Sequence, residues 1–553
     1  MKTRRILCIV LALALTFSAL ALPAAAEEDA PRSYYHEEKL AYVLKAIGLF
    51  YGVSDVNLAL DRRPDRAQSL VLMLRFMGLE PSVRSEFGIQ PFEDTDTFQW
   101  ALQYVGYAYR HGLTHGVSAT RFNGQGITDA RTYLTFILRA LGYSDGEDGD
   151  FSWKDPVPLA RSLGLIPDMV RLDDFRRADV VAISYAALTV NCKGSDVTLA
   201  QDLADRGILK QEALDAYFDP DAAKTGTLAS PYAGNIARFL QETRVPLGID
   251  ISGYPMIYRD NVLQIGDAAY EYYGFYAGGP DACAAQLKAG AAAVAGQARV
   301  FAVGAPNRLG AVLSMEDFSR IASSSSKTEA EGVAYLYEQA GEQVIGVDAI
   351  TNLRLHNNEY IFFRTDHHWT ALGAYYAYQA WAEAAGKEPV NLDQFDAQTR
   401  EGCLGWFYGL CGNPLVMSQN PDTVVAYIPH SNLTAEYLDY GGWRMDDKIV
   451  YNYNNYAAYL LGDHQLVTIT NNDIKDDSAC LLVKDSYGNP FAVYLTQHYH
   501  TVYVIDYRQY CDVQGYLTFS QFAAQKGVQD IIVILPMTMQ SGGTASYLSK
   551  YCR

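Results

Sequence analysis

The spacing of apolar positions changes partway along the chain. Up to about residue 217, apolar residues recur at helical spacing in the runs 70–77, 133–141 and 180–188, and turn residues separate these runs. That spacing predicts amphipathic helices joined by turns. From about residue 245 onward, helical patterns alternate with short apolar runs at residues 300–303, 344–347, 479–483, 502–505 and 531–535. The alternation predicts a multidomain protein whose second part is an α/β domain with a mainly parallel sheet, covered on both faces.

The helical region, residues 32–217, contains three degenerate copies of one phrase. In the clearest copy, an aromatic–acidic start at Phe92 and Asp94 is followed by Gly112 and Gly116. Each copy has an arginine ahead of its second helical run, at Arg66, Arg131 and Arg177. Internal repeats of this length predict stacked helix–turn–helix units. Residues 218–244, marked by Pro and Gly, are expected to be a linker.

These repeats resemble the S-layer homology (SLH) domain, although Gln68 stands at the position of the signature acid in the first copy. The resemblance implies an all-helical unit with pseudo-threefold symmetry that binds a cell-wall polysaccharide. It also implies that Arg66, Arg131 and Arg177 contact the glycan. Planar guanidinium groups suit anionic or pyruvylated sugars. The alternative is that these arginines only occupy helix starts.

The first 26 residues are typical of a secretion signal. Basic residues at positions 2, 4 and 5 precede an apolar run over residues 6–22, and three alanines precede Glu27. A retained membrane anchor is the competing interpretation, but no charged stop-transfer flank follows. No later segment has about 18 consecutive apolar residues. A secreted protein without a retained transmembrane helix is therefore expected.

Composition narrows the range of partners. The net charge of −19 argues against nucleic acid, because no basic footprint is present. The 41 tyrosines offer rings that could stack on sugars, although packing is the expected role of most. Apart from Cys8 in the signal, the cysteines form an odd set that excludes a fully paired framework, although Cys403 and Cys411 could close a small loop. Their spacing gives no metal site, and no cofactor is expected.

Candidate chemistry lies in two segments of the α/β region. Asp366 and His368 follow an apolar run and precede Thr370, the expected N-cap of a helix over residues 371–385. In an extended segment, this spacing points both side chains to one side and His367 to the other. Ser486 lies in a tight turn after the strand 479–483. These are the components of acyl transfer, with Ser486 as nucleophile, His368 as base and Asp366 orienting the imidazole.

Several neighbours of Ser486 are candidates for supporting roles. Backbone N–H groups of residues 486–488, including Tyr487 and Gly488, are expected to converge on an oxyanion, and Asn489 is a further donor or a helix cap. Tyr487 could line the acceptor site. Arg508 could position an anionic sugar or pair with Asp506. The alternative for the Asp-x-His pair is a structural role or a metal site, although no third ligand is apparent.

The run Arg364-Thr365-Asp366-His367-His368-Trp369-Thr370 resembles the DHHW protein family, which is related to alginate O-acetyltransferases and more distantly to SGNH hydrolases. Further matches at residues 405–412, 422–423 and 484–487 follow in the family's order across residues 245–553. The resemblance implies a triad of Asp366, His368 and Ser486. Because Asp and His precede Ser, the order suits the acetyltransferase relatives and departs from simple esterases.

Together these features predict an exported, cell-wall-associated O-acetyltransferase that moves an acetyl group through an acyl-serine to hydroxyls of a cell-surface polysaccharide. The family resemblance implies a membrane-bound O-acyltransferase partner as the source of acetyl groups. Two alternatives stay open. One is a carbohydrate acetylesterase that uses the same triad with water as acceptor. The other is a wall-glycan-binding protein without catalysis.

Overall fold

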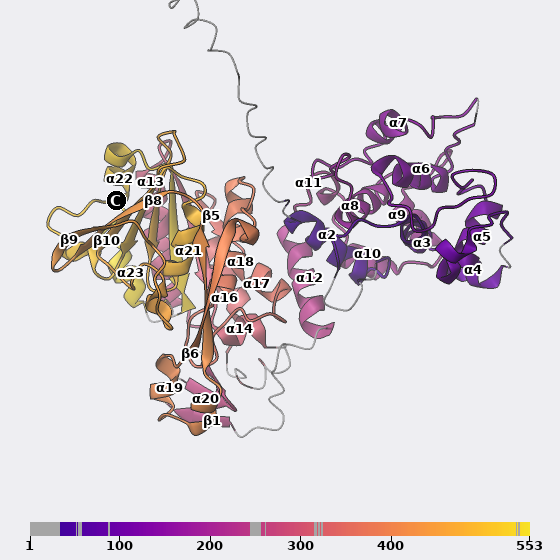
Figure 1. The fold of residues 1–553 in the computed structure, drawn as a ribbon. Coiled ribbons are helices and arrows are strands. Elements are labelled where there is room, and N and C mark those ends of the chain that lie inside the picture. The colour runs from indigo at the N-terminus through magenta and orange to yellow at the C-terminus, as the bar shows by residue number, and fades with distance from the viewer. Residues whose placement is uncertain are drawn as a thin grey trace, which may run out of the picture.

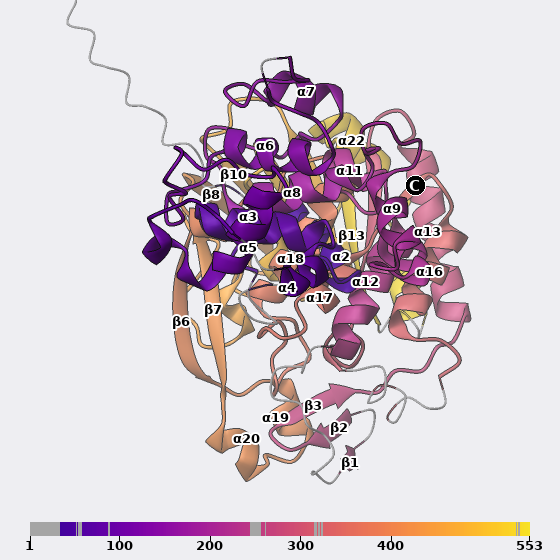
Figure 2. The same ribbon diagram turned by 90° about the vertical axis from the view of Figure 1, so that its right-hand side faces the viewer.

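The computed structural model describes residues 34–50, 58–86, 89–146, 148–243, 256–259, 262–313, 325–537 and 542–553, and also Arg32, Gly52, Phe318, Ile321 and Met539. The expected secretion signal and the expected domain start near residue 245 lie outside this part of the chain. Within the described part, no helix has both the length and the apolarity needed to cross a membrane. Figures 1 and 2 show a helical N-terminal region beside a region built on a large sheet.

The N-terminal region is helical where the apolar spacing predicted helices. Its elements are α2 (Tyr35–Ala46), α3 (Arg66–Phe76), α4 (Glu80–Ser85), α5 (Leu102–Arg110), α6 (Ala130–Ala140), α7 (Val157–Ser162), α8 (Arg177–Ala187), α9 (Leu199–Asp205), α10 (Gln211–Tyr217), α11 (Ala222–Thr225) and α12 (Ser230–Thr243). Asp65 and Asp129 cap α3 and α6 by accepting N–H groups of the first turn. Helices α3, α6 and α8 pack against one another around a shared apolar core.

Residues 218–244 are not an extended linker, because α11 and the whole of α12 fall within them. Ile236 and Leu240 of α12 are buried in the same core cluster as Leu355 of α17 (Ala349–Leu355). The Pro and Gly residues of this segment favoured a linker, although its apolar residues recur at helical spacing. At the same junction, Lys39 Nζ of α2 lies 2.6 Å from Glu383 Oε2 of α18 (Ala371–Ala385). The two regions are therefore packed together (Figure 1).

The large sheet is mixed, whereas the sequence predicted a mainly parallel one. Its strand order is β5-β4-β13-β11-β12-β10-β8-β9. The first five run parallel: β5 (Val344–Val347), β4 (Arg299–Ala305), β13 (Asp530–Pro536), β11 (Ala479–Lys484) and β12 (Thr501–Asp506). The last three pair antiparallel: β10 (Leu466–Asn471), β8 (Leu433–Asp439) and β9 (Gly442–Asp446). The continuous apolar runs found from the sequence are the parallel strands, while β8 and β10 alternate buried with more exposed positions.

Helices cover both faces of the parallel part, as predicted. Ile532 and Ile534 face a core with α18 and α21 (Gly488–Leu495), while Ile531 and Val533 face a second core. Helices α13 (Gly278–Ala293), α16 (Glu329–Ala340), α22 (Phe519–Lys526) and α23 (Gly543–Leu548) supply that second core. The sheet is thus the central layer of a three-layer unit.

Smaller elements complete this unit. They are the antiparallel sheet of β1 (Met256–Arg259), β2 (Val262–Ile265) and β3 (Ala268–Glu271), the ribbon of β6 (Phe395–Cys403) and β7 (Asp422–Pro429), and the short helices α14 (Arg308–Val312), α19 (Trp406–Leu410) and α20 (Leu415–Gln419). No disulfide joins Cys403 to Cys411, which flank α19, so the small disulfide loop considered from the sequence is not present. Asn307, Pro536, Ser486 and Arg508 all lie at or just beyond the carboxyl ends of four neighbouring parallel strands. In sheets of this kind, that edge is where sites form.

Candidate active site

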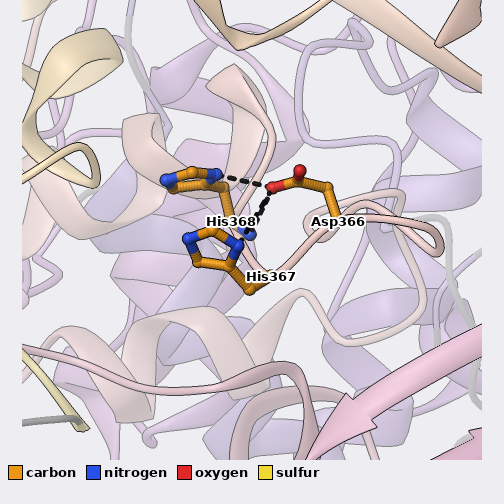
Figure 3. Close-up of side chains that lie close together, drawn as sticks. All are labelled: Asp366, His367 and His368. Carbon is orange, nitrogen blue, oxygen red and sulfur yellow. Dashed lines mark hydrogen bonds and ion pairs between the residues drawn. The ribbon is translucent and has the colours of Figure 1, made fainter. Parts of the chain in front are cut away.

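The segment that carries Asp366 and His368 is a tight hairpin and not an extended run. Phe362 pairs with Trp369 in an antiparallel bridge, and the Phe363 N–H donates to the His368 carbonyl at 3.2 Å. The bend between these residues places His367 beside His368, with ring centroids 3.8 Å apart (Figure 3). The expectation that His367 points away was therefore wrong, because it assumed strand geometry.

Asp422, at the start of β7, fixes the base of this hairpin. Its buried carboxylate accepts the Thr365 N–H at 2.7 Å and the Thr365 hydroxyl at 2.6 Å. The Arg364 N–H donates to the same carboxylate at 3.0 Å, and the Tyr360 hydroxyl donates as well. On the far side of the hairpin, Thr370 caps α18 as predicted, accepting the Gly373 N–H. Both ends of the hairpin that carries Asp366 and His368 are thus anchored.

A chain of hydrogen bonds joins the three predicted triad residues. Ser486 Oγ lies 2.7 Å from His368 Nε2, and His368 Nδ1 lies 2.6 Å from Asp366 Oδ1. Asp366 Oδ2 also accepts the Trp406 N–H at 2.9 Å. The tautomer that fits is His368 with its proton on Nδ1, donated to Asp366, which leaves Nε2 free to accept from Ser486. This is the arrangement that general-base activation of a serine requires.

The surroundings keep Asp366 ionised. Burial alone would raise the pKa of Asp366, but the charge and hydrogen bonding of His368 hold that pKa well below its usual range. Burial and the neighbouring His368 lower the pKa of His367 to about 3, so His367 is a neutral imidazole. On the other side, the Tyr456 ring stacks on His368 with centroids 3.7 Å apart.

Asp366, His367 and His368 also have the composition of a metal site. One donor atom of each lies within 4.8 Å of the others, so His367 supplies the third ligand that was not apparent from the sequence. However, His368 Nδ1 is bonded to Asp366 and His368 Nε2 faces Ser486. A cation bound there would compete with both contacts. The donor set is therefore better suited to proton transfer than to metal binding.

The turn after Ser486 differs from the predicted oxyanion site. The Tyr487 N–H donates to Asp485 Oδ1 at 3.1 Å, and the Gly488 N–H donates to the Asp485 carbonyl at 3.0 Å. Asn489 donates its amide to Asp463 at 3.1 Å and is buried. These donors stabilise the turn and are already engaged. The Tyr487 ring packs on His368 and Trp369, which makes it part of the cavity wall.

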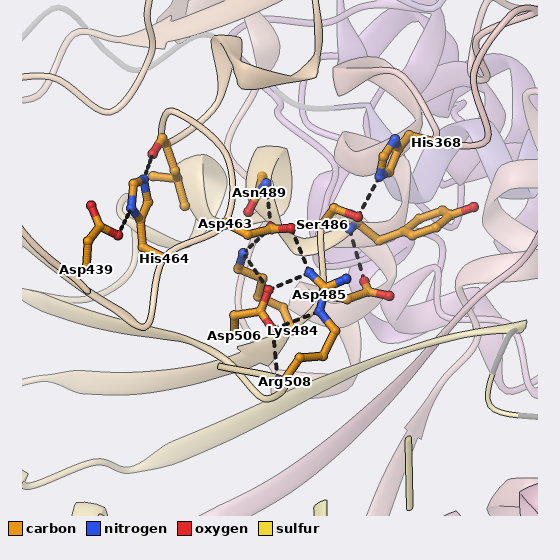
Figure 4. A network of polar contacts seen from close by, with 12 residues as sticks. His368, Asp439, Asp463, His464, Lys484, Asp485, Ser486, Asn489, Asp506 and Arg508 are labelled. Atoms are coloured by element: carbon orange, nitrogen blue, oxygen red, sulfur yellow. Dashed lines mark hydrogen bonds and ion pairs between the residues drawn. The ribbon is translucent and has the colours of Figure 1, made fainter. Parts of the chain in front are cut away.

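Arg508 belongs to a buried ionic network beneath this turn (Figure 4). Its guanidinium donates to Asp506 at 2.9 Å and to Asp463 at 2.6 Å. Lys484, almost fully buried, donates to the same Asp463 at 2.8 Å. Of the two roles considered from the sequence, pairing with Asp506 is the one observed. The network supports Asp485 and Ser486 from below.

A cavity of about 490 Å³ opens over the triad. Its lining also includes Glu271, Asn307, Trp406 and Pro536. None of these four was expected as a site residue from the sequence, although Asn307 and Pro536 lie at strand ends, where sites form in sheets of this kind. Burial raises the pKa of Glu271 to about 7 and that of Asp485 to about 6.

The three arginines predicted to contact glycan do not share one site. Arg66 and Arg131 line a cavity of about 830 Å³ in the N-terminal region, together with His115, Arg139, Trp153 and Lys154. Arg177 does not line that cavity; it is buried, and its Nε donates to the Leu58 carbonyl at 2.9 Å. Burial and the nearby Arg139 lower the pKa of Arg66 to about 10.

The fold and site define the C-terminal region as an α/β domain with a serine-centred hydrogen-bond chain. Residues 249–505 match the family model described as DHHW protein, which confirms for this region the resemblance found in the sequence. Among solved structures, similar ones are a DHHW family protein from Eubacterium siraeum (25% identity, TM-score 0.47, covering 55% of this chain and 98% of that chain) and PatB1 from Bacillus cereus (17%, 0.43, 53% and 100%). The O-acetyltransferase domain of Pseudomonas putida AlgJ is also similar (15%, 0.30, 54% and 99%).

Similar curated proteins are surface proteins by name. A cell surface protein from Thermoanaerobacter kivui is 29% identical over 197 residues, which cover 34% of this chain and 25% of that protein. The middle cell wall protein of Brevibacillus brevis is 29% identical over 140 residues, which cover 25% of this chain and 13% of that protein. This chain thus spans a quarter or less of the length of these relatives.

Proposed function

We propose that this protein is an exported O-acetyltransferase, associated with the cell wall, that acetylates hydroxyl groups of a cell-surface polysaccharide. The observation that carries the proposal is the hydrogen-bond chain from Ser486 through His368 to Asp366 at the floor of a cavity. The DHHW match of the same region supports acyl transfer as its chemistry. The names of the curated relatives support a surface location.

The reaction would proceed in two halves. Ser486 Oγ attacks the acetyl carbonyl of a donor ester while His368 Nε2 takes the serine proton. The donor alcohol leaves with that proton, and the acetyl group stays on Ser486. A sugar hydroxyl then gives its proton to His368 and attacks the acyl carbon. The acetyl-sugar bond forms, the bond to Ser486 Oγ breaks, and the proton returns to Ser486.

Asp366 would act through His368. Its carboxylate fixes the Nδ1–H tautomer and stabilises the imidazolium formed in both halves. Because the Trp406 N–H and His368 both donate to it, the carboxylate is held in place throughout. A membrane-bound O-acyltransferase is the proposed source of acetyl groups, and no cofactor is involved.

The N-terminal region is proposed to hold the enzyme on the wall as three degenerate SLH-type repeats. The cavity with Arg66 and Arg131 supports this role, because cationic groups and the half-exposed Trp153 ring share one concave surface. Attachment to the polymer layer would raise the effective concentration of acceptor hydroxyls at Ser486.

The test is mass spectrometry of the mature protein after exposure to 4-nitrophenyl acetate. An acetyl group on the peptide containing Ser486, absent in Ser486→Ala, is the expected result. Wall polysaccharide added next should receive the acetyl group. Release of free acetate alone would favour the esterase, because solvent reaches the partly exposed Ser486. Absence of both the adduct and acetate release would refute acyl transfer and leave glycan binding.

A further inference from the structure

Trp406 stands at the rim of the catalytic cavity with its side chain uninvolved in the triad bonds. Its indole is 55% exposed and meets His367 edge-on, with ring centroids 5.4 Å apart. Its backbone is tied to the triad, because its N–H donates to Asp366. The preceding Gly405 permits this approach, since a Cβ there would collide with Asp366. The ring is thus held beside the reacting atoms while one side stays open to solvent.

Glu271 forms another part of the wall, at the end of β3. It comes close enough to His368, Asp366 and Asp485 for their charges to act on its carboxyl group. The cavity is therefore lined by three carboxyl groups, those of Glu271, Asp366 and Asp485.

One guanidinium, that of Arg508, lines the same cavity, and it is already bonded to Asp463 and Asp506. Its charge is balanced by those two partners. The potential inside the cavity is consequently negative, and a concave, partly buried site concentrates such a field. An anionic sugar would meet repulsion where its hydroxyl must approach His368.

We propose that Trp406 and Glu271 form the acceptor subsite, and that it takes an uncharged or amino-bearing sugar and disfavours a uronate or phosphorylated one. Trp406 offers a flat apolar face to the C–H side of the ring, and Glu271 hydrogen-bonds its hydroxyl or amino groups. This subsite deepens the proposed function, because it names the class of acceptor.

The N-terminal cavity has the opposite character. Asp129 and Asp145 line it and pair with Arg131 and Arg139, but Arg66 and Lys154 add two further cations, which suits an anionic polymer. The polymer that anchors the protein and the polymer that it acetylates would then differ in charge.

Binding to the Ser486→Ala protein tests the subsite without turnover. Trimers of N-acetylglucosamine, glucosamine and galacturonic acid are titrated by calorimetry at low salt. The first two should bind about tenfold more tightly than the uronate trimer. Trp406→Ala should weaken binding of the N-acetylglucosamine trimer by about tenfold, and Trp406→Phe by less. Trp443→Ala is the matched control, because Trp443 is 61% exposed on the edge strand β9.

In Glu271→Gln, the affinity for the N-acetylglucosamine trimer relative to that for the galacturonic acid trimer should fall by about threefold or more, because a negative charge is removed from the cavity wall. This ratio is measured within one variant, so a partial loss of folded protein does not mimic it. Equal binding of all three trimers, no binding of the N-acetylglucosamine trimer, or equal effects of Trp406→Ala and Trp443→Ala would overturn the proposal. A failure to acetylate Ser486 would instead refute the proposed function and leave this binding result standing.

Discussion

Tyr456 lies flat against His368, with ring centroids 3.7 Å apart and planes inclined by 11°. The Tyr456 hydroxyl is buried and has no hydrogen-bond partner among the described residues. The Tyr456 ring therefore positions the His368 imidazole through stacking and not through a hydrogen bond. Tyr456→Phe should keep the rate of acetyl release from 4-nitrophenyl acetate within about twofold, because the hydroxyl contributes no bond.

Tyr456→Ala should lower that rate by about tenfold or more, because His368 gains room to leave its alignment with Ser486. The effect should fall on kcat and leave the KM for the ester little changed. Equal rates for the alanine and phenylalanine variants would show that the stacking does not position His368.

Asp422 accepts the donors that fix the segment ahead of Asp366, and its carboxylate is fully buried. Asp422→Ala leaves those donors without a partner inside the protein. It should cost about 3 kcal/mol in the free energy of unfolding, measured by urea denaturation. Asp396→Ala removes an exposed carboxylate from the neighbouring strand β6 and should change stability by less than about 0.5 kcal/mol.

Glu329 gives stability a pH dependence. Burial raises its pKa from 4.5 to about 8, and its carboxylate accepts the Asn307 N–H at 2.8 Å. Since the folded protein binds this proton more tightly than the unfolded chain, the contribution of Glu329 is complete below about pH 4.5 and is lost as pH rises through about 8. Glu329→Gln should flatten the fall of Tm between these values.

Glu331→Gln, in the first turn of the same helix, is the control for Glu329→Gln. Hydrogen bonds from Thr328 lower the pKa of Glu331, so this carboxyl stays ionised over that range. Glutamine can also serve at this capping-box position. The slope of Tm against pH should therefore match that of the wild type. A Glu329→Gln variant with the wild-type slope would contradict the assignment.

Arg131 and Arg177 are expected to respond differently to substitution, although they occupy matching repeat positions. The Arg131 side chain is 64% exposed at the cavity, and Arg131→Ala should reduce retention on purified wall polysaccharide by about threefold or more without lowering Tm. Arg177 is buried and packs over Phe50, so Arg177→Ala should lower Tm by several degrees. Equal loss of retention without a change of Tm in both variants would mean that Arg177 also contacts glycan.

Local signals in the sequence located many elements but not the walls of the site. Thr370, expected as an N-cap, marks the start of α18, and the helix predicted over residues 371–385 has the observed bounds. Ser486 and His368 were proposed as partners from their residue types and from a family resemblance, because no spacing rule pairs residues that lie 118 positions apart in sequence. The segment ahead of the bend that turns His367 toward His368 is fixed by Asp422, which lies 57 positions from Thr365 in sequence. Contacts between residues this far apart produce no periodic pattern in the sequence, so periodicity cannot predict them.

Glu271 and Asn307 were missed for a related reason. In the sequence, a single acid at the end of a short strand cannot be told from an exposed surface residue. Glu271 becomes part of the cavity wall only because another strand and α19 pack around it. The backbone N–H groups of Tyr487 and Gly488 were expected to bind an oxyanion. In the structure, both donate to Asp485 within the turn.

The contact between Lys39 of α2 and Glu383 of α18 joins the N-terminal helical region to the helix that begins three residues after His368. This contact and the packing of α12 on α17 hold the two regions in one relative position. Under the proposed function, the active site would therefore stay at a fixed distance from the polymer that the N-terminal region binds. Acetyl groups would be placed only on chains that pass at one distance and in one orientation from the point of attachment, so the modification would mark a layer of the envelope and not its whole depth.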